Sequence, residues 1–246
     1  MRLGEGVWLV GSGQHGFEMS HTLDCSVYLV GDGDEYALID AGGGVEPERI
    51  ERKVEAAGVA MKYVTQLLLT HAHADHAAGA AYFRRAFGLR VIASEEAAPW
   101  VETADPVKTS IGPAIEAGVY PTNFVFPPCP VDETVREGSR IRIGRRTLRV
   151  IDTPGHARGH VSYFMEEADG ARSLFSGDTV FAGGKTVLQN IWDCSIPDYA
   201  ATLKKLRGLA IERMYPGHGP FLLSSASKHI EKALNHFRRL NIPPNL

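Results

Sequence analysis

Four residues of metal-ligand type stand close together in the segment His71-Ala72-His73-Ala74-Asp75-His76, which follows the apolar run 64–69 and Thr70. That run predicts a buried strand ending at Thr70. Histidines at alternate positions just past a strand end point to one side, so His71 and His73 can offer two imidazoles to one metal ion. Asp75 and His76 follow as the chain turns, where they can serve a second cation. Asp75 as a simple helix cap is the alternative, but four ligand-type residues separated only by alanine favour a metal site.

Three later positions complete the same pattern further along the chain. His156 stands in Thr-Pro-Gly-His after the apolar run 148–151, and Asp178 follows Phe-Ser-Gly. His218 stands in Pro-Gly-His-Gly after the run 211–215. Each of the three leaves a predicted strand in a turn that contains glycine, where ligands gather at one rim of a sheet. Taken alone each would be weak evidence, but the ordered set is a specific one.

This order of motifs resembles the metallo-β-lactamase superfamily across nearly the whole chain. The resemblance implies an αββα four-layer sandwich, a single α+β domain spanning residues 1–246, with the metals at one edge. By the same resemblance, the first metal is bound by His71, His73 and His156, the second by Asp75, His76 and His218, and Asp178 bridges both. Asp40, in Leu-Ile-Asp-Ala-Gly, matches the first motif of the superfamily, where the aspartate supports the ligands.

The expected chemistry is hydrolysis driven by two divalent ions. Two neighbouring dications lower the pKa of a shared water, so that hydroxide exists near neutral pH and attacks the carbonyl of a small ester, lactone or thioester. Asp75 is the expected catalytic residue, because it can hold the second metal and also relay a proton. The mixed shell of imidazole and carboxylate favours zinc, although iron and manganese accept the same donors.

Differences between this sequence and particular branches of the superfamily narrow the range of expected reactions. True β-lactamases of the superfamily usually carry Cys or Ser at the position of Asp178, whereas a bridging Asp resembles the ester and thioester hydrolases. The stretch 178–184 is similar to glyoxalase II, whose helical glutathione-binding domain would follow His218, where this sequence has 28 residues. Lactonases that cleave acyl-homoserine lactones often have Tyr where Phe181 stands. A mononuclear iron persulfide dioxygenase shares the ligand set and is the alternative enzyme, and a non-catalytic metal-binding module is the third hypothesis.

Composition limits the class of partner. The formal net charge is −3 at pH 7 over 246 residues, which does not favour a nucleic acid. Neither a membrane-spanning apolar run nor a signal peptide is recognisable, and three scattered cysteines suggest free thiols. We therefore expect a cytoplasmic protein with a small-molecule substrate and no membrane partner; homo-oligomerisation stays open.

Two irregular segments are expected to border the substrate. Residues 11–21 are rich in glycine and polar side chains and predict a loop, and residues 95–130 predict an insertion or lid with two short helical pieces. Whether Lys185, His21 or the 95–130 segment contacts substrate is left open by the sequence. His160 is expected to support the site rather than bind metal, and His229 is expected to be exposed on a terminal helix at 224–240.

Overall fold

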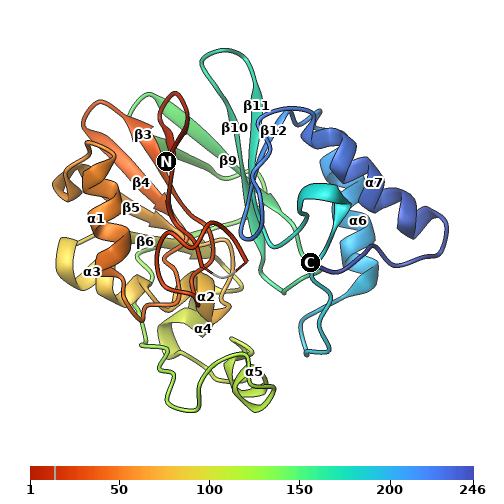
Figure 1. The fold of residues 1–246 in the computed structure, drawn as a ribbon, viewed down its shortest axis with the longest axis horizontal. Helices are drawn as coiled ribbons and strands as arrows, with labels where there is room; N and C mark the ends of the chain where they lie inside the picture. The colour runs from red at the N-terminus through yellow and green to blue at the C-terminus, as the bar shows by residue number, and fades with distance from the viewer. Residues whose placement is uncertain (14) are drawn as a thin grey trace.

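Two β-sheets lie face to face at the centre of the structure, a computed structural model that describes residues 1–13 and 15–246 (Figure 1). Gln14, part of the loop predicted at residues 11–21, lies outside the described residues. In the described part of the chain, one sheet has seven strands in the order β1-β2-β3-β4-β5-β6-β7, and the other has five in the order β12-β11-β10-β9-β8. The first comprises β1 Arg2–Gly4, β2 Val7–Gly11, β3 Val27–Asp32, β4 Glu35–Ile39, β5 Val64–Leu68, β6 Arg90–Ser94 and β7 Glu133–Val135. The second comprises β8 Arg140–Ile143, β9 Arg146–Asp152, β10 Val161–Glu166, β11 Arg172–Gly177 and β12 Arg213–Pro216.

Helices cover the outer face of each sheet. Figure 1 shows α1 and α3 on the outside of the first sheet and α6 and α7 on the outside of the second. The α-helices are α1 Glu48–Ala56, α2 Ala74–Ala77, α3 Ala80–Phe87, α4 Ala98–Thr103, α5 Ile111–Glu116, α6 Ile196–Arg207 and α7 Ala226–Arg238. Amphipathic spacing explains the packing of α1, since Ile50 and Val54 are buried while charged residues occupy its other faces.

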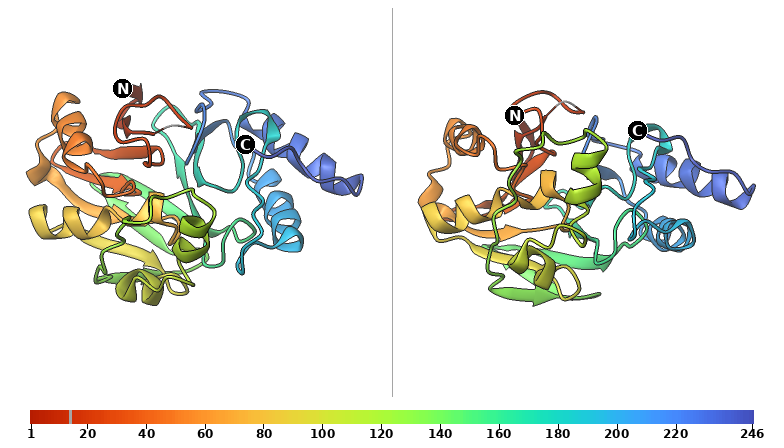
Figure 2. Two further views of the ribbon diagram at one scale, coloured as in Figure 1. Left: turned by 60° about the horizontal axis from the view of Figure 1, so that its bottom comes forward. Right: turned by 90° about the horizontal axis from the view of Figure 1, so that it is seen from below.

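Three layers of apolar side chains hold the four layers of secondary structure together. One lies between the first sheet and its helices and includes Ile50, Phe83 and Val91. A second lies between the two sheets, where Tyr28 of one faces Phe175 of the other. The third joins the second sheet to α6 and α7. This arrangement confirms the predicted αββα sandwich (Figure 2).

The two sheets meet at the rim where several strands end. Within the first sheet β4 and β5 are parallel, with Ile39 beside Leu68, and within the second β11 and β12 are parallel, with Gly177 beside Pro216. Bonds between the sheets fix this rim: the Tyr163 hydroxyl donates to the carbonyl of Leu69 at 2.6 Å, and the Tyr28 hydroxyl donates to that of Pro216 at 2.7 Å. The residues that follow these strand ends therefore face a common space.

Several local expectations needed correction. The strands β1 and β7 were not predicted; they have three residues each and lie at the two edges of the first sheet. The alanine-rich stretch around the ligands forms two helices, α2 and α3, and at Gly79 between them a Cβ would lie 2.1 Å from the carbonyl oxygen of Ala41. The segment 95–130 carries the two expected helical pieces, α4 and α5.

The described residues bear on the membrane span and on the cysteines. Among them, no helix is both long enough and apolar enough to cross a membrane. Cys25, Cys129 and Cys194 are free thiols, the first two buried.

Candidate metal centre

All seven predicted ligands lie together at the rim between the sheets. His71, His73, Asp75 and His76 occupy the loop after β5 and the start of α2. The other three follow strands of the second sheet: His156 after β9, Asp178 directly after β11 and His218 after β12. The chain therefore contributes one group of ligands from each sheet, as the strand-end pattern predicts.

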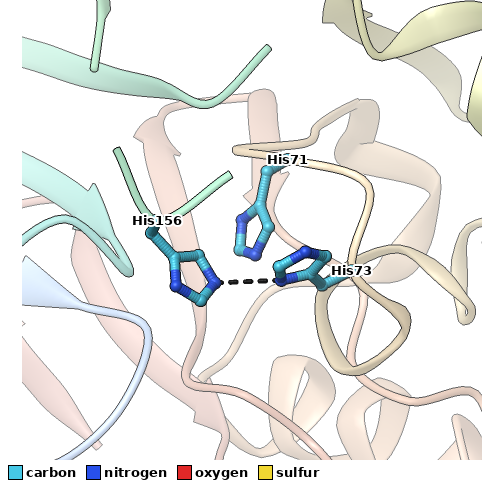
Figure 3. Close-up of side chains that lie close together, drawn as sticks. All are labelled: His71, His73 and His156. Carbon is cyan, nitrogen blue, oxygen red and sulfur yellow. Dashed lines mark hydrogen bonds between the residues drawn. The ribbon is translucent and has the colours of Figure 1, made fainter. Parts of the chain in front are cut away.

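The first cluster consists of three buried histidines, His71, His73 and His156, whose ligand nitrogens lie within 4.8 Å of one another (Figure 3). The Nδ1 atom of His73 is 2.9 Å from Nε2 of His156. In His71, Nδ1 faces the Thr70 hydroxyl at 3.0 Å, while Nε2 is buried without a hydrogen-bond partner among the described residues. A tetrahedral zinc ion holds its nitrogens about 3.3 Å apart, so this cluster has the size of such a site.

The second cluster consists of Asp75, His76 and His218, again with ligand atoms within 4.8 Å of one another. The Oδ2 atom of Asp75 is 3.0 Å from Nε2 of His218 and 3.5 Å from Nε2 of His76. The Nε2 atom of His76 is buried and has no hydrogen-bond partner within the described part of the chain. A buried nitrogen of this kind is costly unless it binds something, which favours a cation at this position.

Asp178 lies between the two clusters. Its Oδ1 atom is 3.3 Å from His76, and its Oδ2 atom is 3.3 Å from His218 and 3.6 Å from His156. One carboxylate thus faces histidines of both clusters. The close packing around it depends on Gly217, where a Cβ would lie 2.2 Å from Asp178 Oδ1.

Supporting groups behind the ligands fix their orientation. Asp40 accepts from Nδ1 of His76 at 2.8 Å and from the backbone N–H of Thr70 at 2.7 Å, which leaves Nε2 of His76 facing the cluster. The carbonyl of Val187 faces Nδ1 of His156 at 3.0 Å and directs its Nε2 inward in the same way. Partners of this kind set the tautomer and the basicity of a metal-binding histidine.

His160 supports Asp178 through the backbone. Its Nε2 atom accepts from the backbone N–H of Asp178 at 3.1 Å, and its Nδ1 atom faces the Thr153 hydroxyl at 2.8 Å. Both nitrogens are therefore engaged away from the clusters, in agreement with the supporting role expected for this residue.

Without metal, the histidine ligands differ in their protonation state. Burial lowers the pKa of His71 well below its ordinary value and that of His156 to about 4, so both rings stay neutral and keep lone pairs for a cation. Burial also acts on His218, but the carboxylates of Asp178 and Asp75 outweigh it and raise its pKa to about 9. Burial disfavours the ionised form of Asp178, yet the facing imidazoles hold the pKa of this carboxyl well below its usual range. In the metal-free protein, the positive charge of protonated His218 thus offsets the negative charge of the two carboxylates. A bound metal ion would supply this positive charge instead.

Three side chains considered from the sequence are not part of these clusters. Lys185 is exposed in the loop after a 3-10 turn at Ala182–Gly184. His21 belongs to a turn, in which its Nδ1 accepts from the backbone N–H of Leu23 at 3.1 Å. The expectation that His229 is exposed was wrong: it is half-buried, and its Nδ1 accepts from the backbone N–H of Gly183 at 2.7 Å.

Two further residues contact the ligands and were not predicted to do so. The Tyr120 hydroxyl donates to Asp75 Oδ1 at 3.1 Å, and the buried Asp193 lies 3.5 Å from Nε2 of His73. Tyr120 belongs to the 95–130 segment expected to be an insertion or lid, and Asp193 stands between Trp192 and Cys194 with no neighbouring ligand motif. Both are far from their partners in sequence, so only the tertiary structure brings them to the site.

Residues 22–218 match the sequence model of the metallo-beta-lactamase superfamily, and the chain belongs to this family. Its fold agrees with solved members: a metallo-beta-lactamase with a HARLDQ motif from Cronobacter sakazakii superposes with a TM-score of 0.76 at 23% identity, covering 98% of this chain and 96% of that one. At this level of identity the likeness concerns the fold alone.

Curated relatives include enzymes with hydrolase names. An atrochrysone carboxyl ACP thioesterase from Aspergillus fumigatus is 26% identical over 204 residues, covering 82% of this chain and 53% of the relative. A hydroxyacylglutathione hydrolase from Chelativorans sp. is 35% identical over 153 residues, covering 62% of this chain and 47% of the relative. The chain thus spans about half the length of these curated relatives.

Proposed function

We propose that this protein is a metal-dependent hydrolase that cleaves a small thioester, ester or lactone with two divalent ions, most simply zinc. His71, His73 and His156 would hold the first ion, and Asp75, His76 and His218 the second. The single observation that carries the proposal is the position of Asp178, whose two carboxylate oxygens face histidines of both clusters at 3.3–3.6 Å. A carboxylate in that position suits a bridge between two cations better than a single site.

Bound ions would supply an activated water and a Lewis acid for the substrate carbonyl. The chain's own residues hold these groups rigidly: Asp40 orients His76, and the carbonyl of Val187 orients His156. Rigid positioning matters because small displacements of reacting groups cost large factors in rate.

Asp75 is the residue proposed to move a proton. Its side chain is 20% exposed, whereas that of Asp178 is 5% exposed, so Asp75 is the carboxylate more accessible to a leaving group. Its Oδ2 atom faces the second cluster at 3.0 Å from His218. Asp75 can therefore bind a cation and accept or return a proton at the same edge of the site.

The names of the relatives support a hydrolase of thioesters. One relative is a thioesterase acting on an acyl carrier protein, and the other acts on a hydroxyacylglutathione. Both names describe thioester substrates, so a thioester is the first substrate class to test on this chain.

The test combines metal analysis with a substrate panel. Protein purified without added metal is analysed for zinc, iron and manganese and then assayed on small thioesters, esters and lactones. We expect about two zinc ions per chain and turnover of at least one thioester. His73→Ala should lose metal and activity together, while His236→Ala, on the remote helix α7, should retain both. One iron per chain with oxygen uptake on a persulfide would overturn the proposal, as would full metal content and turnover in His73→Ala.

A further inference from the structure

The segment 98–126, which contains α4 and α5, contacts Asp75 of the second cluster directly and is linked to His73 of the first cluster through Asp193. Figure 1 places α4 and α5 below α2, at the lower edge of the view. The segment is anchored rather than loosely laid over the site: Ile111, Tyr120 and Phe126 are buried in the core between the first sheet and its helices. Its polar side chains are therefore held in place by the same packing that builds the fold.

Tyr120 contacts Asp75 twice. Its hydroxyl accepts from the backbone N–H of Asp75 at 3.2 Å and donates to Oδ1 of the same residue at 3.1 Å. The other carboxylate oxygen, Oδ2, faces His218 at 3.0 Å. Because Tyr120 occupies Oδ1, it selects Oδ2 as the atom that points into the second cluster.

Asp193 has a corresponding place behind His73. The Ser110 hydroxyl donates to Oδ1 of Asp193 at 3.3 Å, and Oδ2 of Asp193 lies 3.5 Å from Nε2 of His73. That Nε2 atom is buried and makes no hydrogen bond at this distance among the described residues, and Asp193 is the carboxylate that faces it. A proton on Nε2 leaves the lone pair on Nδ1, the atom that lies 2.9 Å from His156 inside the first cluster.

The two arrangements share one design. In each, a hydroxyl of the segment 98–126 binds one oxygen of a carboxylate and leaves the other free to act on the site: Oδ2 of Asp75 faces the second cluster, and Oδ2 of Asp193 faces the outer nitrogen of His73. His73 also differs from His71 and His156, which present Nε2 to the cluster and have Nδ1 engaged behind. The orientation of His73 therefore needs its own partner, and among the described residues Asp193 is the carboxylate within 4.0 Å of its Nε2.

We propose that the segment 98–126 is a structural part of the metal centre, in which Tyr120 positions Asp75 and Ser110, acting through Asp193, positions His73. This inference rests on the proposed two-ion site and deepens it. It differs from the expected role of the segment as a lid, because a lid acts on substrate binding, whereas positioning residues act on metal affinity. Tyr120 and Asp193 are thus assigned to different ions.

The test measures the affinity of each zinc ion by competition with a chromophoric chelator. Tyr120→Phe is expected to lower the affinity for the second zinc ion about 10-fold to 100-fold and to change that for the first ion little. Asp193→Asn is expected to lower the affinity for the first ion by a similar factor and to change that for the second ion little. Matched controls remove the same groups elsewhere: Tyr82→Phe loses a hydroxyl bond to Glu51, and Asp132→Asn loses a carboxylate bonded to Arg84. Both controls should leave the two zinc affinities unchanged.

A measurement on the unmodified protein keeps the inference falsifiable if a variant folds poorly. Zinc binding should slow hydrogen exchange of amides in residues 109–120 relative to the metal-free protein, because ordering the ligands orders their partners. Unchanged exchange there, or wild-type zinc affinities in both variants, would overturn the inference and leave the proposed function standing. Two zinc ions with the predicted variant effects, but no turnover of any substrate in the panel, would refute the proposed function and leave this inference standing.

Discussion

Replacing Asp178 by asparagine removes the negative charge between the two clusters while keeping the shape of the side chain. Asp178 is almost fully buried, and its carboxylate lies 3.3 Å from His218. In the metal-free protein this carboxylate, together with Asp75, raises the pKa of His218 to about 9 from an ordinary value of 6.5. The substitution should therefore destabilise the metal-free protein in a manner that depends on pH.

The size and sign of the effect follow from the pKa of His218. A rise from 6.5 to about 9 corresponds to stabilisation on the order of 3 kcal/mol. Because the folded pKa is raised, this contribution is fully present below pH 6.5 and is lost as the pH rises through about 9. Asp75 remains in the variant at 3.0 Å from His218, so we expect Asp178→Asn to remove about 1–2 kcal/mol at pH 6. For a chain of this size, that is roughly 2–8 °C in melting temperature.

Urea denaturation of chelator-treated protein at pH 6 and pH 9.5 measures this contribution. Asp178→Asn should be destabilised at pH 6 and approach the wild type at pH 9.5. Asp132→Asn is the matched control: the pKa of Asp132 is below its usual range, so its carboxylate is ionised at both pH values and its effect should not change between them. Equal destabilisation of Asp178→Asn at both pH values would show that packing, not charge, explains the effect, and would refute this reasoning.

Three further predictions concern metal binding. Binding of the second zinc ion should displace the proton from His218, so the affinity for this ion should fall about tenfold for each pH unit below pH 9. Calorimetry in two buffers with different ionisation enthalpies should detect the released proton. Binding heats that do not depend on the buffer would contradict this prediction. Asp40→Asn should lower the affinity for the same ion about 10-fold to 100-fold in a chelator competition. Asparagine tolerates the left-handed backbone at φ 62° but lacks the negative charge that orients His76. An unchanged affinity would exclude this role of Asp40. Gly217→Ala should lower zinc content, measured by mass spectrometry, since its Cβ would lie 2.2 Å from Asp178 Oδ1; a full zinc complement would show that the site tolerates this displacement.

The strand-end pattern explains why so much of the site is visible in the sequence. His71, Asp178 and His218 each follow a strand of fixed direction, and parallel strands end at the same edge, so local sequence predicts their meeting. The four-layer sandwich was implied by the resemblance to the superfamily, whereas apolar runs and helical periodicity predict only separate strands and helices. Conversely, β1 and β7 are too short for any periodicity to mark them.

Contacts between distant segments could not be predicted. Tyr120 lies 45 residues from Asp75 in the chain, and their bond depends on how the segment 98–126 packs against the first sheet. His229 illustrates the same limit on the other side of the molecule, since its bond to Gly183 joins α7 to a loop 46 residues away. Such contacts are set by tertiary packing and leave no local pattern in the sequence.

Anomalous diffraction from crystals of the zinc-loaded protein, recorded on both sides of the zinc absorption edge, measures directly whether two ions are bound and which residues hold them. We expect two zinc peaks at the rim between the sheets, one bonded to His71, His73 and His156 and the other to Asp75, His76 and His218, with Asp178 bonded to both. A single peak, or a second peak that Asp178 does not touch, would refute a two-ion site bridged by Asp178.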